Sequence, residues 1–207
     1  MTIQELKPSK RVKGRWLAVL EDGSILRIGE KEVIDFSLYA GKELAEETVE
    51  RLLDSARRGE LKEKTIALLA RKPMSRVELL GKLREWEAGE EEANAICDRM
   101  EELGFLNDAE YAARLVRHYS AKGYGTHKVR DELRRRGVPR ELWDAALEEM
   151  EDSAGAIDAF LAKKLAGRAV DRKELKKITD ALARRGFSWS EIGEAVRRYD
   201  AQADEWE

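Results

Sequence analysis

The spacing of hydrophobic positions divides the chain into a short β-rich start and a long helical remainder. Apolar residues are dense over Arg11–Leu20, Asp22-Gly23 has the composition of a two-residue hairpin turn, and a second apolar run follows at Ser24–Ile28. This pattern predicts a β-hairpin, with a further short element at residues 33–39. An isolated hairpin is marginal in water, so we expect it to pack on a helix over residues 45–58. The apolar stripe of that helix is Val49, Leu52 and Leu53.

Beyond residue 60 the hydrophobic pattern repeats itself. Leu83, Leu133 and Leu182 align without gaps, and in the second and third copies Gly137 and Gly186 follow four residues later. Further aligned sets are Ala93, Trp143 and Ile192; Cys97, Leu147 and Val196; and Met100, Met150 and Tyr199. A repeat of this length is typical of stacked helical modules.

We expect three helices in each repeat. Ser75 with Glu78, and Ser188 with Glu191, have the spacing of capping boxes, and Pro139 suits a first helical position. The glycines of the repeat suit helix ends. The predicted helices are residues 62–71, 75–86 and 90–103; 108–121, 126–136 and 139–150; and 153–166, 171–185 and 188–199.

The predicted fold class is mainly α, with tandem three-helix repeats in an elongated, curved array after a small N-terminal β-hairpin and helix. A module of this size has a small core and is marginal alone, whereas modules in tandem bury more by stacking. The predicted boundaries are 1–60 for the N-terminal extension, 61–107 and 108–152 for the first two repeats, and 153–207 for the third repeat and tail.

Several aromatic residues and the single cysteine are expected in packing roles. Cys97 lies at an aligned core position and is expected to be buried. We expect Trp143 and Trp189 to pack in or beside helix contacts, and Trp16 to hold the hairpin to the helices. A helical core stripe is formed by Tyr111, Leu115, Val116 and Tyr119.

Charge is distributed very unevenly along a chain whose formal net charge is only -3. Ten acids and one base lie between Glu85 and Tyr111, whereas nine bases and two acids lie between Arg114 and Arg140. One cysteine excludes an intramolecular disulfide and fits a reducing compartment. Without a signal peptide or a long apolar run, we expect a cytoplasmic protein that does not enter a membrane.

The basic stretch is the best candidate for function. On the predicted helix 126–136, Val129 and Leu133 point inward, which places the bases outward. Cations near an aromatic side chain suit contact with phosphate and stacking, although a merely solvated helix face is the alternative. The candidate contact residues are Arg114, Arg117, Lys122, Tyr124, His127, Lys128, Arg130, Arg134 and Arg135.

Other charged or glycine-rich stretches are weaker candidates. The acidic stretch would face a basic partner or mimic phosphate, but we favour a solvated helix. Gly123-Tyr124-Gly125 is a weak phosphate-cradle signal and fits a tight turn better. A second basic set would prolong the basic surface if its helices face the same way: Lys163, Lys164, Arg168, Arg172, Lys173, Lys176, Lys177, Arg184 and Arg185.

Catalysis finds little support in the sequence. The two histidines, His118 and His127, lie nine residues apart among bases. No cluster has metal-ligand spacing, and neither a Walker loop nor a nucleophile elbow is present. We expect no enzyme activity, no metal and no cofactor.

Four groups of motifs lie close together over roughly residues 65–150. They are Leu68-Leu69-Ala70-Arg71; Ser75-Arg76-Val77-Glu78-Leu79 with Lys82-Leu83; Gly104-Phe105-Leu106-Asn107-Asp108 with Tyr111-Ala112; and Lys122-Gly123-Tyr124-Gly125 with Val129, Glu132-Leu133 and Arg136-Gly137-Val138. Together they resemble a known family, the RecX regulatory proteins. Arg185-Gly186-Phe187-Ser188 is the best match to that family beyond this range, and the hairpin resembles an extension in some members. One departure is Glu87, where many members carry a glycine.

The resemblance implies a non-enzymatic regulator of the RecA recombinase in homologous recombination, DNA repair and the SOS response. Its implied partners are the RecA filament and DNA, contacted through phosphates within the filament, and we expect a monomer. One alternative is a stand-alone, non-sequence-specific DNA-binding repeat protein, since few Asn or Gln residues are available to read bases. Another is a repeat scaffold that binds a different protein.

Overall fold

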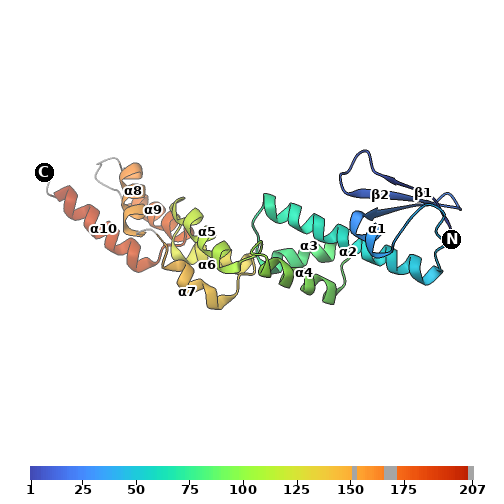
Figure 1. Cartoon of the computed structure of the whole chain (residues 1–207). Coiled ribbons are helices and arrows are strands. Elements are labelled where there is room, and N and C mark those ends of the chain that lie inside the picture. The colour runs from blue at the N-terminus through green and yellow to red at the C-terminus, as the bar shows by residue number, and fades with distance from the viewer. Residues whose placement is uncertain (151–152, 166–171, 205–207) are drawn as a thin grey trace. The chain divides into compact units, whose positions relative to one another are not determined.

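The computed structural model describes residues 1–150, 153–165 and 172–204. Over these residues the protein is mainly helical, with a small three-stranded sheet near the N-terminus (Figure 1). The chain forms two compact units, one of residues 1–71 with 85–89 and one of residues 72–84 with the chain from 90 onward. The predicted fold class, mainly helical with a small β element at the start, is confirmed.

The sheet of the first unit is antiparallel, with β2 (Arg15–Leu20) between β1 (Ile3–Pro8) and β3 (Ile25–Gly29). The predicted hairpin turn joins β2 to β3. Its Gly23 has a φ of +82°, and Asp22 Oδ1 accepts a hydrogen bond of 2.9 Å from the Ser24 N–H. The predicted β-hairpin is therefore present and gains a third strand.

The hydrophobic pattern missed β1 and misplaced two neighbouring elements. In β1 only Ile3 is fully buried and a bulge shifts the register before Glu5, so no clean alternation marks the strand. The strand predicted from residue 11 begins only at Arg15, because Gly14 turns the chain with a φ of +77°. The short element expected at residues 33–39 is the end of helix α1 (Glu30–Asp35).

Two predicted helices, residues 45–58 and 62–71, are one continuous helix, α2 (Glu46–Arg71). The predicted break was wrong because Gly59 costs a helix only about 1 kcal/mol, while the buried stripe continues past it at Leu61, Thr65 and Leu69. In the first half of α2, Val49 and Leu52 are buried as predicted, but Leu53 is 47% exposed because it lies about 100° around the helix from Leu52. Trp16 packs against the core that these residues share with the sheet, as expected.

The second unit contains the repeated helices, and most of them begin and end within two residues of their predicted bounds. The exceptions are α10, which runs further than predicted, and the helix predicted at 139–150. There a 3-10 turn, η1 (Arg140–Leu142), leads into a short α7 (Trp143–Leu147), and acidic Glu148 and Glu149 follow, which the negative end of a helix dipole disfavours. The other helices are α3 (Arg76–Glu85), α4 (Glu90–Glu102), α5 (Asp108–Ser120), α6 (Thr126–Arg135), α8 (Ser153–Leu165), α9 (Arg172–Arg184) and α10 (Trp189–Asp204).

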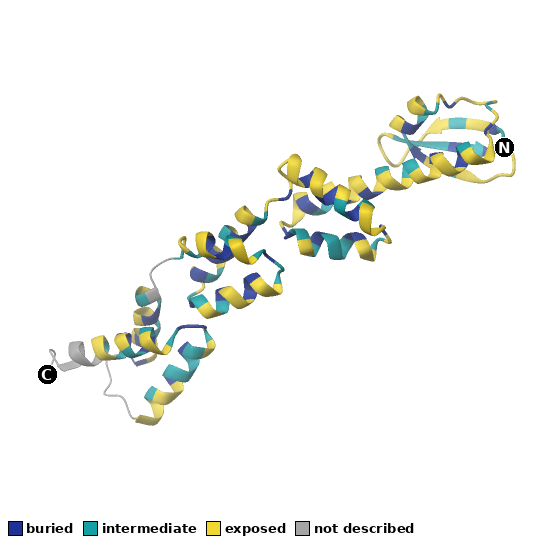
Figure 2. Ribbon diagram, turned by 90° about the horizontal axis from the view of Figure 1, so that it is seen from below, coloured by how far each residue is buried: buried dark blue, intermediate teal, exposed yellow. Residues whose placement is uncertain are grey.

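The second and third repeats each bury a core of their own (Figure 2). The predicted stripe on α5 is confirmed, with Tyr119 half-buried at its end.

Cys97 is fully buried as predicted, and burial raises the pKa of its thiol to about 11. Trp143 is buried and its indole N–H donates to the Val138 carbonyl over 2.9 Å, whereas the packing predicted for Trp189 is wrong. Trp189 is 65% exposed because it is the first residue of α10, outside the stripe that continues at Ile192 and Ala195.

A hydrogen bond to a backbone carbonyl joins neighbouring repeats at equivalent positions within the second unit. The residue that follows the second helix of the later repeat accepts a hydrogen bond, through its carbonyl, from the residue that precedes the second helix of the earlier repeat. Thus the Ser75 hydroxyl donates to the Arg136 carbonyl, and the Gly125 N–H donates to the Arg185 carbonyl over 2.9 Å. Ser75 and Gly125 occupy equivalent repeat positions, as do the two arginines.

Left-handed turns make this close approach possible. Gly137 and Gly186 have φ values of +67° and +90°. A Cβ on Gly137 would lie 2.6 Å from Val77 Cβ, and one on Gly186 would lie 2.5 Å from Lys128 Cβ. Glu87, the residue that replaces the expected glycine, adopts the same conformation with a φ of +61°. The turn is thus common to all three repeats, even where the residue disfavours it.

A partly buried polar network strengthens the junction of the first two repeats. Glu78 accepts hydrogen bonds from the Tyr111 hydroxyl (2.8 Å), from the Arg136 guanidinium (3.1 Å) and from the Ser75 N–H (3.1 Å). The Ser75 hydroxyl accepts from the Glu78 N–H in return, which completes the predicted capping box. Burial and the bond to Glu78 raise the pKa of Tyr111 to about 12.

We predict that Gly186→Ala destabilises the protein by about 2 kcal/mol or more, because the new Cβ strains a left-handed turn and collides with backbone neighbours. The matched control is Gly193→Ala, at a helical site with open space around the new Cβ. That change is expected to stabilise by about 0.5–1 kcal/mol. Urea unfolding of both variants measures the difference, and equal effects would show that the contact at Gly186 is not tight.

Glu87→Gly is expected to have the opposite effect. Relief of the left-handed strain is worth roughly 1–2 kcal/mol, and the greater freedom of glycine in the unfolded chain offsets part of it. A small net stabilisation should appear as a higher urea midpoint. A lower midpoint would mean that the glutamate side chain contributes a contact that outweighs the strain.

Glu78→Gln is expected to destabilise the protein by roughly 1–3 kcal/mol, because it removes the charge that Arg136 faces in a partly buried site. The control is Glu102→Gln, which removes an acid whose pair with Arg99 is exposed and worth about 0–1 kcal/mol. Thermal unfolding of both variants compares the two pairs. A loss no larger than the control's would show that the network adds nothing beyond a surface ion pair.

Candidate functional site

Helices α5 and α6 of the second repeat present the predicted basic residues. Asn107 caps α5 by accepting a hydrogen bond of 3.0 Å from the Glu110 N–H. In α6, Val129 and Leu133 are completely buried, so the inward positions predicted for them are confirmed. The remaining positions of α6 carry its bases, which lie on two sides of the helix.

One side of α6 is organised by a carboxylate. Glu132 is 7% exposed and lies between Lys128, at 3.5 Å, and Arg135, whose Nε donates over 3.0 Å. Burial alone would raise the pKa of Glu132, but hydrogen bonds from Arg135 and Tyr119 outweigh it and lower the pKa. Glu132 therefore stays ionised and holds Lys128 and Arg135 towards α5.

The other side of α6 faces the start of α7. Arg130 lies 3.7 Å from Asp144, and Arg134 pairs with Asp131 at 3.4 Å. The Arg134 guanidinium also lies over the Trp143 ring, 5.7 Å from its centroid. Arg130, Arg134 and His127 are all exposed. The predicted outward face of α6 therefore divides into this group and the pair held by Glu132.

The two arginines of α5 are exposed and paired with acids. Arg114 lies 3.0 Å from Glu110, one turn earlier, and Arg117 pairs with Glu149 beyond the end of α7. The neighbouring His118 ring makes an edge contact with Tyr119, at 5.4 Å between centroids. Arg114 and Arg117 thus lie at the surface without joining the cluster around Glu132.

The turn from α5 to α6 carries the two remaining candidates. Lys122 is exposed, and no described carboxylate lies within ion-pair distance of it. Tyr124 is half-buried between the Tyr119 ring (5.7 Å) and the Arg185 guanidinium (5.8 Å). Because the Gly125 N–H already donates to the Arg185 carbonyl, the turn fits the tight-turn interpretation better than a phosphate cradle.

Pairing with acids does not make these bases unavailable. The pairs of α5 and of the Arg130 side of α6 are exposed, so each contributes about 0–1 kcal/mol and is screened by salt. An incoming phosphate can replace such a carboxylate at little cost. Lys128 and Arg135 differ because their shared partner Glu132 is buried and cannot turn away.

The acidic stretch before α5 also has internal partners. Arg76 Nη2 lies 2.6 Å from Asp98, and its Nη1 lies 3.0 Å from Glu101. The N–H of Arg76 donates to Asp108 over 2.8 Å, and burial raises the pKa of this aspartate. Other acids of α4, such as Glu90 and Glu91, are exposed, as expected for a solvated helix.

Two interactions within the site were not predicted from the sequence, those of Glu132 with its neighbouring bases and of Arg185 with Tyr124. Glu132 had a local signal, since it lies four residues after Lys128 and three before Arg135. Arg185 had none that would place it on Tyr124, because this contact joins residues far apart in sequence. Of the second basic set, Arg168 lies outside the described residues.

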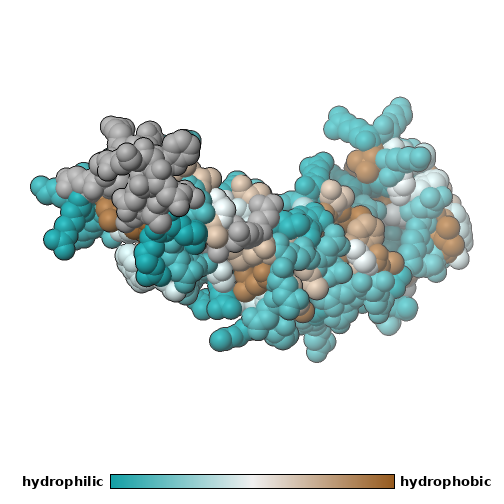
Figure 3. Space-filling view, turned by 90° about the vertical axis from the view of Figure 1, so that its left-hand side faces the viewer, coloured by the Kyte–Doolittle hydropathy of each residue, from teal (hydrophilic) through white to brown (hydrophobic). Residues whose placement is uncertain are grey.

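The surface gives few hints of other site types. On the face shown in Figure 3, hydrophilic side chains dominate and apolar patches are small. Within the described ranges, no group of three or more His, Cys, Asp or Glu side chains is placed to hold a metal ion. No described helix is both long and apolar enough to span a bilayer.

Comparison with known proteins identifies relatives over most of the chain. The family model of the second three-helix domain of RecX matches residues 107–147, and that of the third matches residues 151–196. The regulatory protein RecX of Pseudomonas entomophila (strain L48) is 38% identical over 135 residues, which cover 64% of this chain and 87% of that protein. The RecX of Lactobacillus delbrueckii subsp. bulgaricus is 28% identical over 212 residues, covering 98% of this chain and 76% of the relative.

Solved structures share the fold. A crystal structure of regulatory protein RecX has a TM-score of 0.73 at 23% identity, covering 95% of this chain and 98% of the other. RecX from Lactobacillus salivarius has a TM-score of 0.65 at 21% identity, covering 70% of this chain and 97% of the other. With a relative 38% identical across most of its length, this chain belongs to the RecX family of regulatory proteins.

Proposed function

We propose that this protein regulates the RecA recombinase by binding the RecA–DNA filament, and that the exposed bases of α5 and α6 contact DNA phosphate there. Membership of the RecX family supports the regulatory role. One observation supports the phosphate contact. Arg130 and Arg134, on one side of α6, have guanidinium groups that are exposed and only weakly paired with acids.

The two guanidinium groups can exchange their carboxylate partners for phosphates, and this favours binding to a polyanion. A phosphate that displaces Asp144 or Asp131 accepts the same guanidinium hydrogen bonds, and binding also releases counterions from the nucleic acid. Arg114, Arg117, Lys122 and His127 add cationic or polar groups nearby in the same repeat. Lys128 and Arg135, held by Glu132, would contribute mainly through their charge.

The composition of α6 favours phosphate contact over sequence reading. Its ten residues include no Asn or Gln, the side chains that most often read adenine in the major groove. A regulator that acts along a filament needs to bind wherever the filament forms. Contacts that fix position without selecting sequence meet that need.

Regulation of RecA would follow if this protein bridged DNA and neighbouring RecA subunits. A protein that contacts DNA phosphate with one repeat and neighbouring RecA subunits with other faces would block the addition of monomers or favour their release. We propose that it does so as a monomer in the cytoplasm, without catalysis or a cofactor, in DNA repair and homologous recombination.

The test is RecA ATPase on single-stranded DNA, with the protein added at substoichiometric amounts. The wild type is expected to lower the activity, and the Arg130→Glu/Arg134→Glu variant to need on the order of tenfold more protein for the same effect. The matched control is Arg58→Glu/Lys62→Glu on α2, which reverses two exposed charges at the same spacing, one of them also in a surface ion pair.

Circular dichroism and thermal unfolding would first establish that both variants fold. Equal inhibition by the wild type and the folded Arg130/Arg134 variant would reject the assignment of this surface. A wild type that leaves RecA unaffected but binds naked DNA tightly at physiological salt would instead favour the stand-alone DNA-binding protein.

A further inference from the structure

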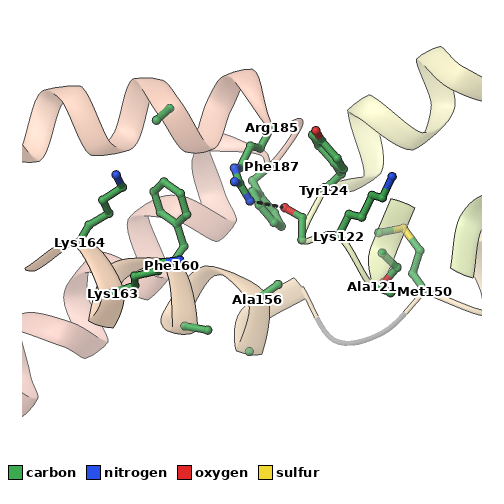
Figure 4. Close-up of a pocket in the computed structure, with 15 residues that line it drawn as sticks. Ala121, Lys122, Tyr124, Met150, Ala156, Phe160, Lys163, Lys164, Arg185 and Phe187 are labelled. Carbon is green, nitrogen blue, oxygen red and sulfur yellow. Dashed lines mark hydrogen bonds between the residues drawn. The ribbon is translucent and has the colours of Figure 1, made fainter. Parts of the chain in front are cut away.

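A cleft of about 940 Å³ opens between the second and third repeats (Figure 4). Its walls come from the α5–α6 turn, from one side of α8 and from the end of α9. Small residues, Gly155, Ala156 and Ala159, line the α8 side and leave room. The volume is within the range of about 300–1,000 Å³ typical of ligand sites.

The charged residues that line the cleft are all bases: Lys122, Lys163, Lys164 and Arg185. Figure 4 shows Lys163 and Lys164 towards one end and Lys122 towards the other. Within the described part of the chain, no carboxylate lies within ion-pair distance of these groups. In a chain with more acids than bases, this concentration of unpaired positive charge favours an anionic ligand with more than one charge.

Aromatic rings occupy the middle of the cleft. The Arg185 guanidinium lies 4.8 Å from the Phe160 centroid and 5.8 Å from the Tyr124 centroid, and its Nη1 donates to the Gly123 carbonyl over 3.3 Å. Lys164 Nζ lies 6.0 Å from the Phe160 ring. Phe160 and Tyr124 are only half-buried, so each keeps exposed ring surface beside a cation.

We propose that this cleft binds single-stranded nucleic acid, with successive phosphates on the lysines at its two ends and an unpaired base stacked on Phe160 and the Arg185 plane. Stacking on aromatic rings beside a basic groove is the general way in which proteins hold single strands. A paired base keeps both faces in its own helical stack and cannot lie on the ring. The cleft therefore favours a single strand over a duplex.

The arrangement argues against two other occupants. A free nucleotide would engage the lysines of one end only, whereas a strand engages both ends. An acidic protein segment would satisfy the lysines but leave the aromatic rings without a flat partner. The proposal deepens the proposed function, on which it rests for its nucleic-acid partner, by naming the form of nucleic acid that this pair of repeats prefers.

The experiment measures binding of a fluorescein-labelled 15-mer of deoxythymidine to the full chain by anisotropy, over a range of salt concentrations and without RecA. Phe160→Leu is expected to weaken binding about fivefold or more through lost stacking, with an unchanged salt slope. Lys163→Gln/Lys164→Gln is expected to reduce the magnitude of the salt slope by about 1.4, since two phosphate contacts are lost.

Matched controls lie in the same repeat outside the cleft. Arg197→Gln/Arg198→Gln removes two adjacent exposed arginines of α10, and Trp189→Leu removes an exposed aromatic ring of the same helix. Both are expected to bind the oligonucleotide like the wild type. A labelled duplex of the same length should be weakened much less by Phe160→Leu than the single strand is.

Four outcomes would overturn the proposal. The first is that both cleft variants bind the oligonucleotide like the wild type, and the second is that Phe160→Leu weakens single-strand and duplex binding equally. The third is that millimolar deoxythymidine monophosphate fully displaces the oligonucleotide. The fourth is that the cleft variants lose RecA inhibition but still bind the oligonucleotide. The last would assign the cleft to an acidic protein surface. If the cleft proposal fails, the effect of Arg130 and Arg134 on RecA ATPase can still be observed. If the proposed RecA regulation fails, oligonucleotide binding by the cleft can still be measured.

Discussion

The close backbone contact at the glycine turns is the constraint on which the candidate site depends. At its start, α6 is tied to the third repeat, because the Gly125 and His127 N–H groups donate to the Arg185 and Gly186 carbonyls. At its end, α6 is tied to the first repeat through the Arg136 carbonyl. Two of these three hydrogen bonds join backbone groups, and the third joins the Ser75 hydroxyl to a backbone carbonyl. The helix that carries most of the candidate bases is therefore held at both ends, and the same contact brings Arg185 to the aromatic rings of the cleft.

The ion pairs of the first and second repeats fall into two kinds: buried or partly buried pairs that stabilise the fold, and exposed pairs whose bases remain available to a partner. The partly buried pair of Glu78 and Arg136 fastens a junction, and the buried Glu132 fixes Lys128 and Arg135. These acids cannot exchange partners without leaving a buried charge, which is costly. The acids beside Arg130, Arg134 and Arg114 are exposed, so a phosphate can take their place. A formal net charge of -3 is therefore compatible with local affinity for a polyanion.

The sequence predicted what depends on local pattern. Repeat spacing and capping boxes placed most helices of the second unit, and the alignment identified Cys97 as buried. The resemblance to RecX proteins marked Glu87 as a residue that stands where many members carry a glycine. Prediction failed where local signals were weak or conflicting, as in β1, the Gly59 region of α2 and the short α7. For the site, helical periodicity identified the outward bases. It could not find the cleft, because Phe160 and Arg185 meet Tyr124 only through the packing of separate repeats.

The α6 surface and the cleft would distinguish different features of a nucleic acid. Guanidinium groups on an exposed helix detect phosphate, which every strand carries, so this surface responds to the presence of a polyanion. A cleft that combines lysines with half-buried rings responds to an unpaired base, so it distinguishes a single strand from a duplex. Because the contact at Gly186 fixes α6 relative to the end of α9, the two features keep a constant separation. A strand that satisfies both must follow one path across the two repeats, which would give a regulator a defined orientation on its nucleic acid without any reading of sequence.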